Sequence, residues 1–136
     1  MSLEENKAVA RRAMEAIDQR NMDGVIAQCA LNTTWHGFSP EPLNNDGYRQ
    51  AIAVFLNAFP DSRFTVEAVI AEGDKVAVQH SLHGTHNGDF QNIPPTGKSV
   101  VVPAVVIFRM EKGKIVEAWL NAELLGLLMQ LGAVPA

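Results

Sequence analysis

The hydrophobic pattern of this 136-residue chain changes its period near Pro60. Before this point, apolar residues recur at every third or fourth position, which predicts an amphipathic helix from Leu3 to Arg20 capped by Ser2. After it, apolar and polar residues alternate, as they do in half-buried strands. An all-helical bundle is excluded because the helical period does not continue. Helices followed by a meandering antiparallel sheet are typical of an α+β domain.

Between the first helix and Pro60, turn-forming residues divide the chain into short elements. Asp23 is expected to cap a second short helix that runs to about Ala30. The β-forming residues Thr33, Thr34 and Trp35 then predict a strand. A loop is expected over 37–45, and a third helix over 47–58.

The alternating region predicts two hairpins. In the first, a turn at Glu72-Gly73-Asp74 joins two strands whose apolar faces carry Phe64, Val66, Ala68 and Ile70, and Val76, Val78, His80 and Leu82. The run 100–108 is almost continuously apolar, so we expect a strand buried on both faces, with Pro103 marking a bulge or an edge. A turn over 111–114 leads into the strand 115–121.

The last expected element is a leucine-rich helix over 123–131, which is too apolar to be left in water. A long curved sheet covered on one side by helices can form a cone with an apolar interior. Such an interior would be a small-molecule site, so a small hydrophobic ligand is the expected partner.

Composition excludes several classes of protein. A chain of 136 residues forms a single domain, 1–136, and no stretch is long and apolar enough to span a membrane. A formal charge of −4 without a basic cluster argues against nucleic-acid binding. The single cysteine, Cys29, cannot form an internal disulfide, and the N-terminal sequence lacks the features of a secretory signal. We therefore expect a soluble, cytoplasmic protein in which Cys29 is a packed small side chain.

Seven short motifs carry a resemblance that extends over nearly the whole chain. They are FPDSRF at 59–64, AEGDKVAV at 71–78, GTH at 84–86, PPTG at 94–97, FR at 108–109, GKIVE at 113–117 and LGLLMQLG at 125–132. In order and spacing they resemble the SnoaL-like polyketide cyclase family. The resemblance implies the nuclear-transport-factor-2-like fold, a cone of curved antiparallel sheet with three helices at its mouth, and a homodimer formed through the open sheet face.

The resemblance also implies a reaction. Characterised members of this family close a ring of an aromatic polyketide ester by intramolecular aldol condensation, without metal or organic cofactor. Such a reaction needs a base, hydrogen-bond donors for the enolate and a dry cavity. The family's base is an aspartate just before the closing helix, where this chain has Glu123, with Asn121 as the other polar candidate. Glu123 would keep the base with one extra methylene; if Asn121 is the counterpart, the base is lost.

Four histidines are further candidates for proton transfer. Strand alternation places His80 and His83 on opposite faces, so these two and His86 do not form a metal site and we expect no metal. His80 and His86 are candidate acids or hydrogen-bond donors. For His86 and His36, a hydrogen bond that fixes a loop is the competing interpretation.

Aromatic and polar side chains near the predicted strand ends could position a ligand. Trp35, His36, Trp119 and Asn121 are the candidates, although aromatic residues at this spacing are also typical of a core. We expect Arg109 to pair with Glu117 across the second hairpin. Two functions remain open: a cofactor-free cyclase, lyase or isomerase with Glu123 as base, and a non-catalytic binding or dimeric scaffold protein of the same fold.

Overall fold

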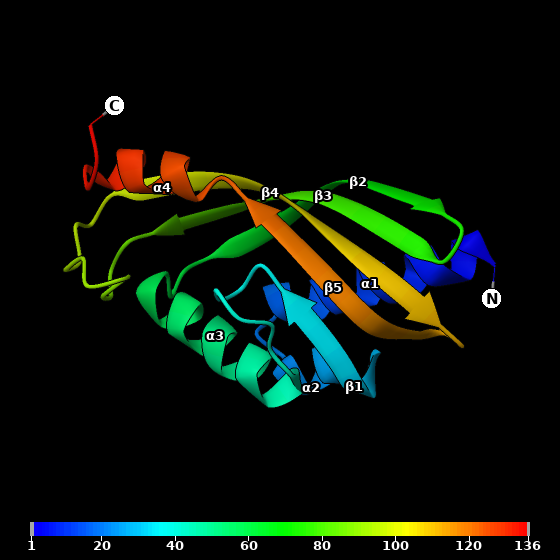
Figure 1. The fold of residues 1–136 in the computed structure, drawn as a ribbon. Helices are drawn as coiled ribbons and strands as arrows, with labels where there is room; N and C mark the ends of the chain where they lie inside the picture. Colours follow the sequence, from blue (N-terminus) through cyan, green and yellow to red (C-terminus); the bar gives the residue numbers. More distant parts are fainter. Residues whose placement is uncertain (1, 136) are drawn as a thin grey trace.

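The computed structural model describes residues 2–135 and begins with two packed helices (Figure 1). Helix α1 spans Leu3–Asp18, and its capping box is complete, because the Ser2 hydroxyl accepts from the Glu5 N–H and the Glu5 carboxylate accepts from the Ser2 N–H. The predicted cap is confirmed. Helix α2 is shorter than predicted, Met22–Ile26, and its cap is Asn21 rather than Asp23. It ends early because the next strand already begins at Cys29.

Strand β1, Cys29–His36, leads through a loop into helix α3, Asn45–Ala58. Asn44 caps α3 by accepting a hydrogen bond from the Gly47 N–H at 2.8 Å, so the helix begins two residues before the predicted start. Within α3, Tyr48 and Ile52 lie one turn apart and are both buried. This face of α3 therefore packs into the interior of the fold.

The first hairpin consists of β2, Arg63–Glu72, and β3, Lys75–Thr85, joined at the predicted turn. A bulge between Val66 and Ala68 shifts the alternation of β2 by one residue. As a result Val69 packs against the core, whereas Ile70 is 65% exposed on the other face. The prediction that Phe64, Val66, Ala68 and Ile70 share one face is wrong, since simple alternation takes no account of a bulge.

The second hairpin consists of β4, Ser99–Glu111, and β5, Lys114–Ala122. The prediction that β4 is buried on both faces is wrong for the isolated chain: Val102 is buried, but Val101 is 45% exposed. Pro103 lies at an edge and not at a bulge, because its pairing with Ser81 of β3 is regular and β5 pairs only from Ala104 onward. The Pro103 nitrogen, which carries no hydrogen, faces the side of β4 opposite β3. The proline therefore costs no hydrogen bond between β3 and β4.

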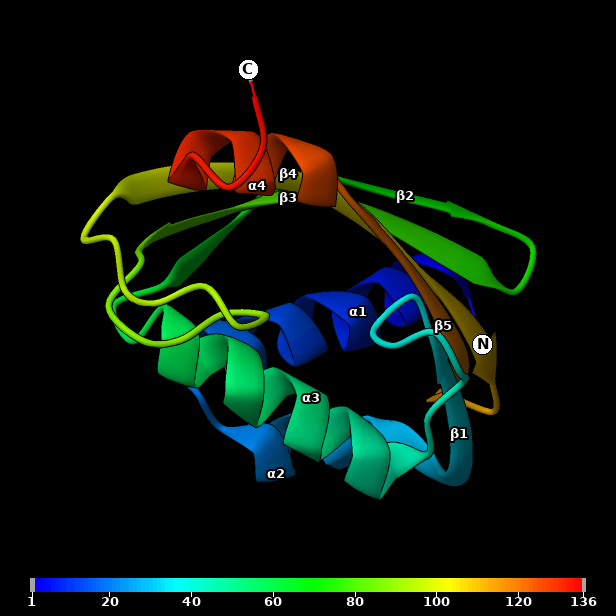
Figure 2. The ribbon, with the colours of Figure 1, turned by 60° about the vertical axis from the view of Figure 1, so that its left-hand side comes forward.

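The strands form one sheet in the order β1-β5-β4-β3-β2, curved but not closed (Figures 1 and 2). Four strands pair antiparallel as predicted, whereas β1 joins β5 in parallel. Helices α1 and α3 lie beneath the concave face of the sheet (Figure 2). The predicted α+β cone with N-terminal helices packed over a curved sheet is confirmed.

Helix α4, Leu124–Leu131, lies beside the end of β4 that β5 leaves unpaired. Its Leu127 and Leu131 are buried against Leu82 and Val102. The Gln130 side chain accepts a hydrogen bond from the Val101 N–H at 2.9 Å and donates one to the Val101 carbonyl at 2.8 Å. The amide thus takes the place of a neighbouring strand. Among residues 2–135, no helix has the length and apolar character needed to cross a membrane.

Candidate functional site

A small cavity lies between the helices and the concave face of the sheet. Its volume is about 40 Å³, and it is lined mainly by aliphatic and aromatic side chains from α1, α3, the β1–α3 loop and the sheet: Met14, Ile17, Trp35, Phe38, Tyr48, Ile52, His80, Val106, Phe108 and Leu120. None of these residues carries a permanent charge. Two bear polar groups that matter for chemistry here, the imidazole of His80 and the hydroxyl of Tyr48.

His80 enters the cavity from the middle of β3. It is buried, and it pairs with Ala104 of β4 on the concave face. Its Nδ1 lies 3.1 Å from the Val78 carbonyl oxygen. A carbonyl oxygen can only accept, so the neutral ring carries its proton on Nδ1 and leaves Nε2 with a free lone pair. The predicted separation from His83 is confirmed, because His83 is exposed on the opposite face.

The protonation state of His80 follows from its surroundings. Burial among apolar side chains lowers the pKa of His80, while the hydrogen bond to Val78 and the carboxylate of Glu67 act in the opposite direction. At neutral pH the imidazole is therefore uncharged. An uncharged imidazole with a free Nε2 can take a proton from a ligand in the cavity.

Tyr48 was not singled out by the sequence, although it begins the buried stripe of α3. Its ring stacks on Trp35 with centroids 3.6 Å apart and planes 5° apart, and its edge meets Phe38 at 5.1 Å. The Tyr48 hydroxyl is buried without a hydrogen-bond partner among residues 2–135. The sequence feature that could have indicated Tyr48 is its hydroxyl, because the other residues of this helical stripe, Ile52, Phe55 and Phe59, are apolar.

Trp35 lines the cavity. The indole is 1% exposed, and its Nε1–H donates to Asn45 Oδ1 at 2.9 Å. The Asn45 amide in turn donates to the Ala30 carbonyl at 3.0 Å. Because Nε1 is already engaged, Trp35 offers a ligand an apolar ring surface and no donor.

His36, Trp119 and Asn121 lie on the convex face of the sheet, away from the cavity. Trp119 and Asn121 alternate with the cavity residue Leu120 and pair with Ile107 and Val105 of β4. The imidazole of His36 stacks on Trp119 with centroids 5.5 Å apart. Two of the candidate ligand-positioning residues, His36 and Trp119, thus contact each other, but outside the cone.

On the convex face, Glu117 bonds to two neighbouring side chains, His36 and Arg109. His36 Nε2 lies 2.7 Å from a Glu117 carboxylate oxygen, and the other oxygen accepts from Arg109 Nε at 3.2 Å. The hydrogen bond from His36, with further help from Arg109, lowers the pKa of Glu117. The predicted pairing of Arg109 with Glu117 is confirmed.

Glu123 is exposed at the start of α4. It occupies the N-cap position, but its side chain makes no capping hydrogen bond. Its carboxylate is not among the groups that line the cavity. The structure therefore brings His80 and Trp35 together in the cavity and leaves Glu123 outside it.

His86 is fully buried beyond the end of β3 and belongs to a different part of the interior. The Thr96 N–H donates to His86 Nδ1 at 3.2 Å, so the neutral ring carries its proton on Nε2. Its backbone also bonds to Lys98 and Gly97. These contacts fix the β3–β4 loop, which is the structural interpretation considered from the sequence.

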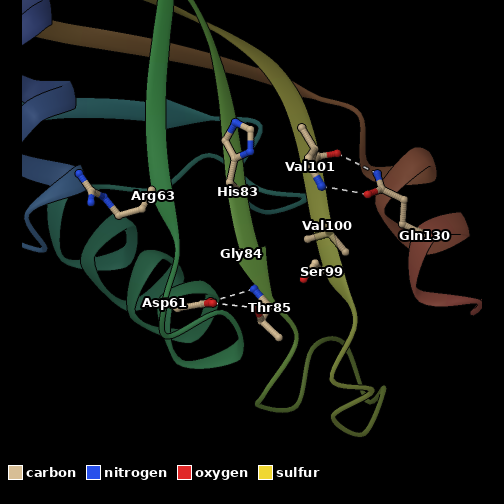
Figure 3. A pocket seen from close by; sticks show the side chains of 9 residues that line it. All are labelled: Asp61, Arg63, His83, Gly84, Thr85, Ser99, Val100, Val101 and Gln130. Carbon is tan, nitrogen blue, oxygen red and sulfur yellow. Dashed lines mark hydrogen bonds between the residues drawn. The ribbon is translucent and has the colours of Figure 1, made fainter.

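A wider, open groove of about 360 Å³ lies at the end of the strands beside α4 (Figure 3). Most of its polar groups already bond to one another: Asp61 accepts from Thr85, and Gln130 bonds to Val101, as the dashed lines show (Figure 3). Arg63 pairs with Asp18 at 2.9 Å. The groove therefore offers a ligand few free groups, and the cavity is the stronger candidate site.

Metal binding and thiol chemistry find no support in the described residues. Within residues 2–135, no three His, Cys, Asp or Glu side chains come together as a metal site requires. Burial raises the pKa of the Cys29 thiol to about 11, which disfavours the reactive thiolate.

Comparison with known proteins decides the family. The family model for SnoaL-like polyketide cyclases matches residues 7–131. The chain belongs to the SnoaL-like polyketide cyclase family. No curated protein sequence gives a significant match.

Solved structures agree with this assignment. AclR from Streptomyces galilaeus, which is proposed to be a hydroxylase, is 28% identical with a TM-score of 0.90, over 99% of this chain and 85% of AclR. A proposed SnoaL-like polyketide cyclase from Jannaschia sp. CCS1 is 26% identical with a TM-score of 0.87, over 96% of this chain and 94% of that chain. IdmH from Streptomyces antibioticus, a proposed polyketide cyclase, is 24% identical with a TM-score of 0.84, over 93% and 98%, and shows the fold alone. Proteins of similar fold thus carry different proposed activities.

Proposed function

We propose that this protein is a cofactor-independent enzyme that removes a proton next to a carbonyl group, with His80 as the base. The observation that carries the proposal is the hydrogen bond from His80 Nδ1 to the Val78 carbonyl, which leaves Nε2 as the free basic atom of a mainly apolar cavity. Membership of the SnoaL-like polyketide cyclase family supports carbonyl chemistry. The proposed base is therefore His80 and not Glu123.

The reaction we propose is an intramolecular aldol closure. His80 Nε2 takes the proton from the carbon beside a carbonyl; the C–H electron pair becomes the enolate double bond, and the carbonyl π pair moves to its oxygen. The pair of the enolate double bond then forms a C–C bond to a second carbonyl carbon of the same molecule, while a pair on the enolate oxygen restores the first carbonyl. The π pair of that carbonyl becomes an alkoxide, which takes the proton back from His80. No oxidant or reductant is needed, and the proton count balances.

The cavity must widen to admit a substrate, since about 40 Å³ is little more than the volume of one water molecule. Two wall residues are suited to move. Phe38 belongs to the loop between β1 and α3 and is only half-buried. Met14 has an unbranched, adaptable side chain.

Proton exchange tests the proposal without knowledge of the natural substrate. The protein is incubated in D₂O with methyl ketones such as acetophenone and methyl 4-acetylbenzoate, and loss of the methyl proton signal is followed by NMR. We expect exchange above the buffer rate, reduced about 100-fold or more in His80→Gln. Glu123→Gln is the matched control, because it removes the other candidate base and its carboxylate is exposed.

Each outcome decides between the candidates. Exchange that survives in His80→Gln and is lost in Glu123→Gln would assign the base to Glu123. Exchange equal in both variants and in wild type would remove both residues as bases. Exchange lost in His80→Gln alone supports the proposal.

A second candidate function is ligand binding without catalysis. It is favoured by one observation: no carboxylate lines the cavity, and Glu123, a candidate counterpart of the family's base, is exposed. In that case ketones would raise the unfolding temperature without any exchange of their protons. Thermal shift and exchange measured on the same samples separate the two functions.

We further propose that the protein is a homodimer formed through the convex face of the sheet. Apolar side chains are exposed on this face and on the adjoining α4, among them Ile70 at 65%, Val101 at 45% and Leu125 at 66%. In such a dimer His36 and Trp119 would lie at the interface. Sedimentation equilibrium should give twice the chain mass of 14.8 kDa; a monomer at micromolar concentration would contradict the proposal.

A further inference from the structure

The buried hydroxyl of Tyr48 has no role in holding the described chain together. The residue is 0% exposed, and Oη has no hydrogen-bond partner within residues 2–135. A buried hydroxyl without a partner loses its bonds to water and gains nothing in return. Phenylalanine would fill the same space without this cost.

The position of the Tyr48 ring is nevertheless held by a fixed neighbour. One face of the ring stacks on Trp35, whose indole is fixed by its hydrogen bond to Asn45. Tyr48 and His80 come from opposite walls, helix α3 and strand β3, and both line the same cavity. The residues that line the cavity thus include one with a basic ring nitrogen and one with a buried hydroxyl that has no partner among residues 2–135.

The protonation state of Tyr48 suits it to donate. Burial raises the pKa of the Tyr48 hydroxyl above its ordinary value, so the group keeps its proton at neutral pH. A hydroxyl that keeps its proton and lacks a partner can donate to an oxygen that enters the cavity.

We propose that Tyr48 donates a hydrogen bond to the carbonyl oxygen of the substrate whose α-proton His80 removes, and that this pair selects uncharged ketones and esters over carboxylates. The inference rests on the proposed function. It adds the group that meets the negative charge developing on the enolate oxygen, which is where a hydrogen-bond donor contributes most to rate.

The preference for uncharged substrates follows from the other walls. The lining residues include no lysine or arginine, and the carboxylate of Glu67, which acts on His80, is exposed outside the cavity. A carboxylate in the cavity would lose its hydration without gaining an opposite charge. A neutral ester of the same shape would not meet this cost.

The test combines activity with stability. Proton exchange is measured with methyl 4-acetylbenzoate and with the free acid 4-acetylbenzoate, which carry the same methyl ketone. We expect wild type to prefer the ester at least 100-fold in kcat/KM, and Tyr48→Phe to lower kcat/KM for the ester at least tenfold. The unfolding temperature of Tyr48→Phe should equal or exceed that of wild type.

Thr33→Val is the matched control for removal of a buried hydroxyl. Thr33 is 1% exposed, but its Oγ1 lies 2.8 Å from the Ala30 carbonyl and 2.7 Å from the Ile115 carbonyl, so its hydroxyl is satisfied. This variant should have a lower unfolding temperature and, at a temperature where it is folded, unchanged exchange activity. The contrast separates a hydroxyl kept for structure from one kept for a ligand.

The result that would overturn the inference is unchanged kcat/KM in Tyr48→Phe, or an unfolding temperature lowered as in Thr33→Val. Equal rates for the ester and the acid would overturn the proposed selectivity. If wild type itself exchanges neither ketone, the proposed function fails first, which distinguishes that failure from a failure of the Tyr48 inference.

Discussion

Replacement of Asn45 by alanine should loosen the wall on which the Tyr48 ring rests. Asn45 is the first residue of α3 and joins that helix to β1 through three hydrogen bonds: Oδ1 accepts from Trp35 Nε1 at 2.9 Å, and Nδ2 donates to the Ala30 carbonyl at 3.0 Å and to the Leu31 carbonyl at 3.3 Å. Asn45→Ala removes all three bonds. It leaves the indole N–H of a side chain that is 1% exposed without a partner.

The expected cost can be worked from these contacts. An unsatisfied buried donor costs about 1–3 kcal/mol, and the lower half of that range applies because the Asn45 side chain is only half-buried. Alanine returns roughly 0.5 kcal/mol through its higher helix propensity. The net loss in the free energy of unfolding should therefore be about 0.5–1.5 kcal/mol.

Urea denaturation with a double-mutant cycle measures this loss. Trp35→Phe removes the indole N–H, so in that background Asn45→Ala should cost about 1 kcal/mol less than in wild type. Asn57→Ala, an exposed asparagine of the same helix, should change stability by no more than about 0.5 kcal/mol. A coupling energy near zero between Asn45 and Trp35 would refute the claim that this hydrogen bond holds the indole.

Three further predictions concern single side chains. Burial lowers the pKa of His80, so as the pH falls below about 6.5 the imidazole is protonated in the unfolded chain before it is protonated in the folded one. The free energy of unfolding should therefore decrease in this range, and the decrease should be smaller in His80→Phe. Parallel curves of unfolding free energy against pH for the two proteins would contradict this. Gln130→Glu should lower the free energy of unfolding by about 1 kcal/mol at pH 7, since a carboxylate cannot donate to the Val101 carbonyl. The difference from wild type should be smaller near pH 4, where the glutamate side chain is protonated and can donate. Urea denaturation at both pH values measures the difference. With its pKa of about 11, the Cys29 thiol should react with Ellman's reagent at pH 8 only slowly until urea unfolds the chain, and rapid reaction of the folded protein would contradict the burial of this thiol.

The fold could be predicted from the sequence because hydrophobic period is a local property. The helix after Ser2, the turns at Gly73 and Gly113 and the closing leucine-rich helix each depend on a few neighbouring residues. The bulge after Val66 does not, because it depends on how β2 pairs with β3. That single irregularity moved Ile70 to the convex face.

The candidate site was predicted less completely, for a related reason. Strand alternation separates His80 from His83 but does not say which face is concave, and the aromatic and polar residues Trp119 and Asn121 lie on the convex one. The sequence does not distinguish Tyr48 from a core residue, because a tyrosine on a buried helical face is usually part of a core. Its distinguishing property, a hydroxyl with no partner, exists only in three dimensions.

The amide of Gln130 has a consequence for the solution behaviour of the protein. Over Ser99–Pro103, β4 has no neighbouring strand on one side. Such an open edge can recruit a strand from another molecule. Gln130 occupies both the donor and the acceptor of Val101 there. A side chain from a helix thus protects this edge against intermolecular β-pairing, so the sheet ends at this point without a charged residue or an additional strand.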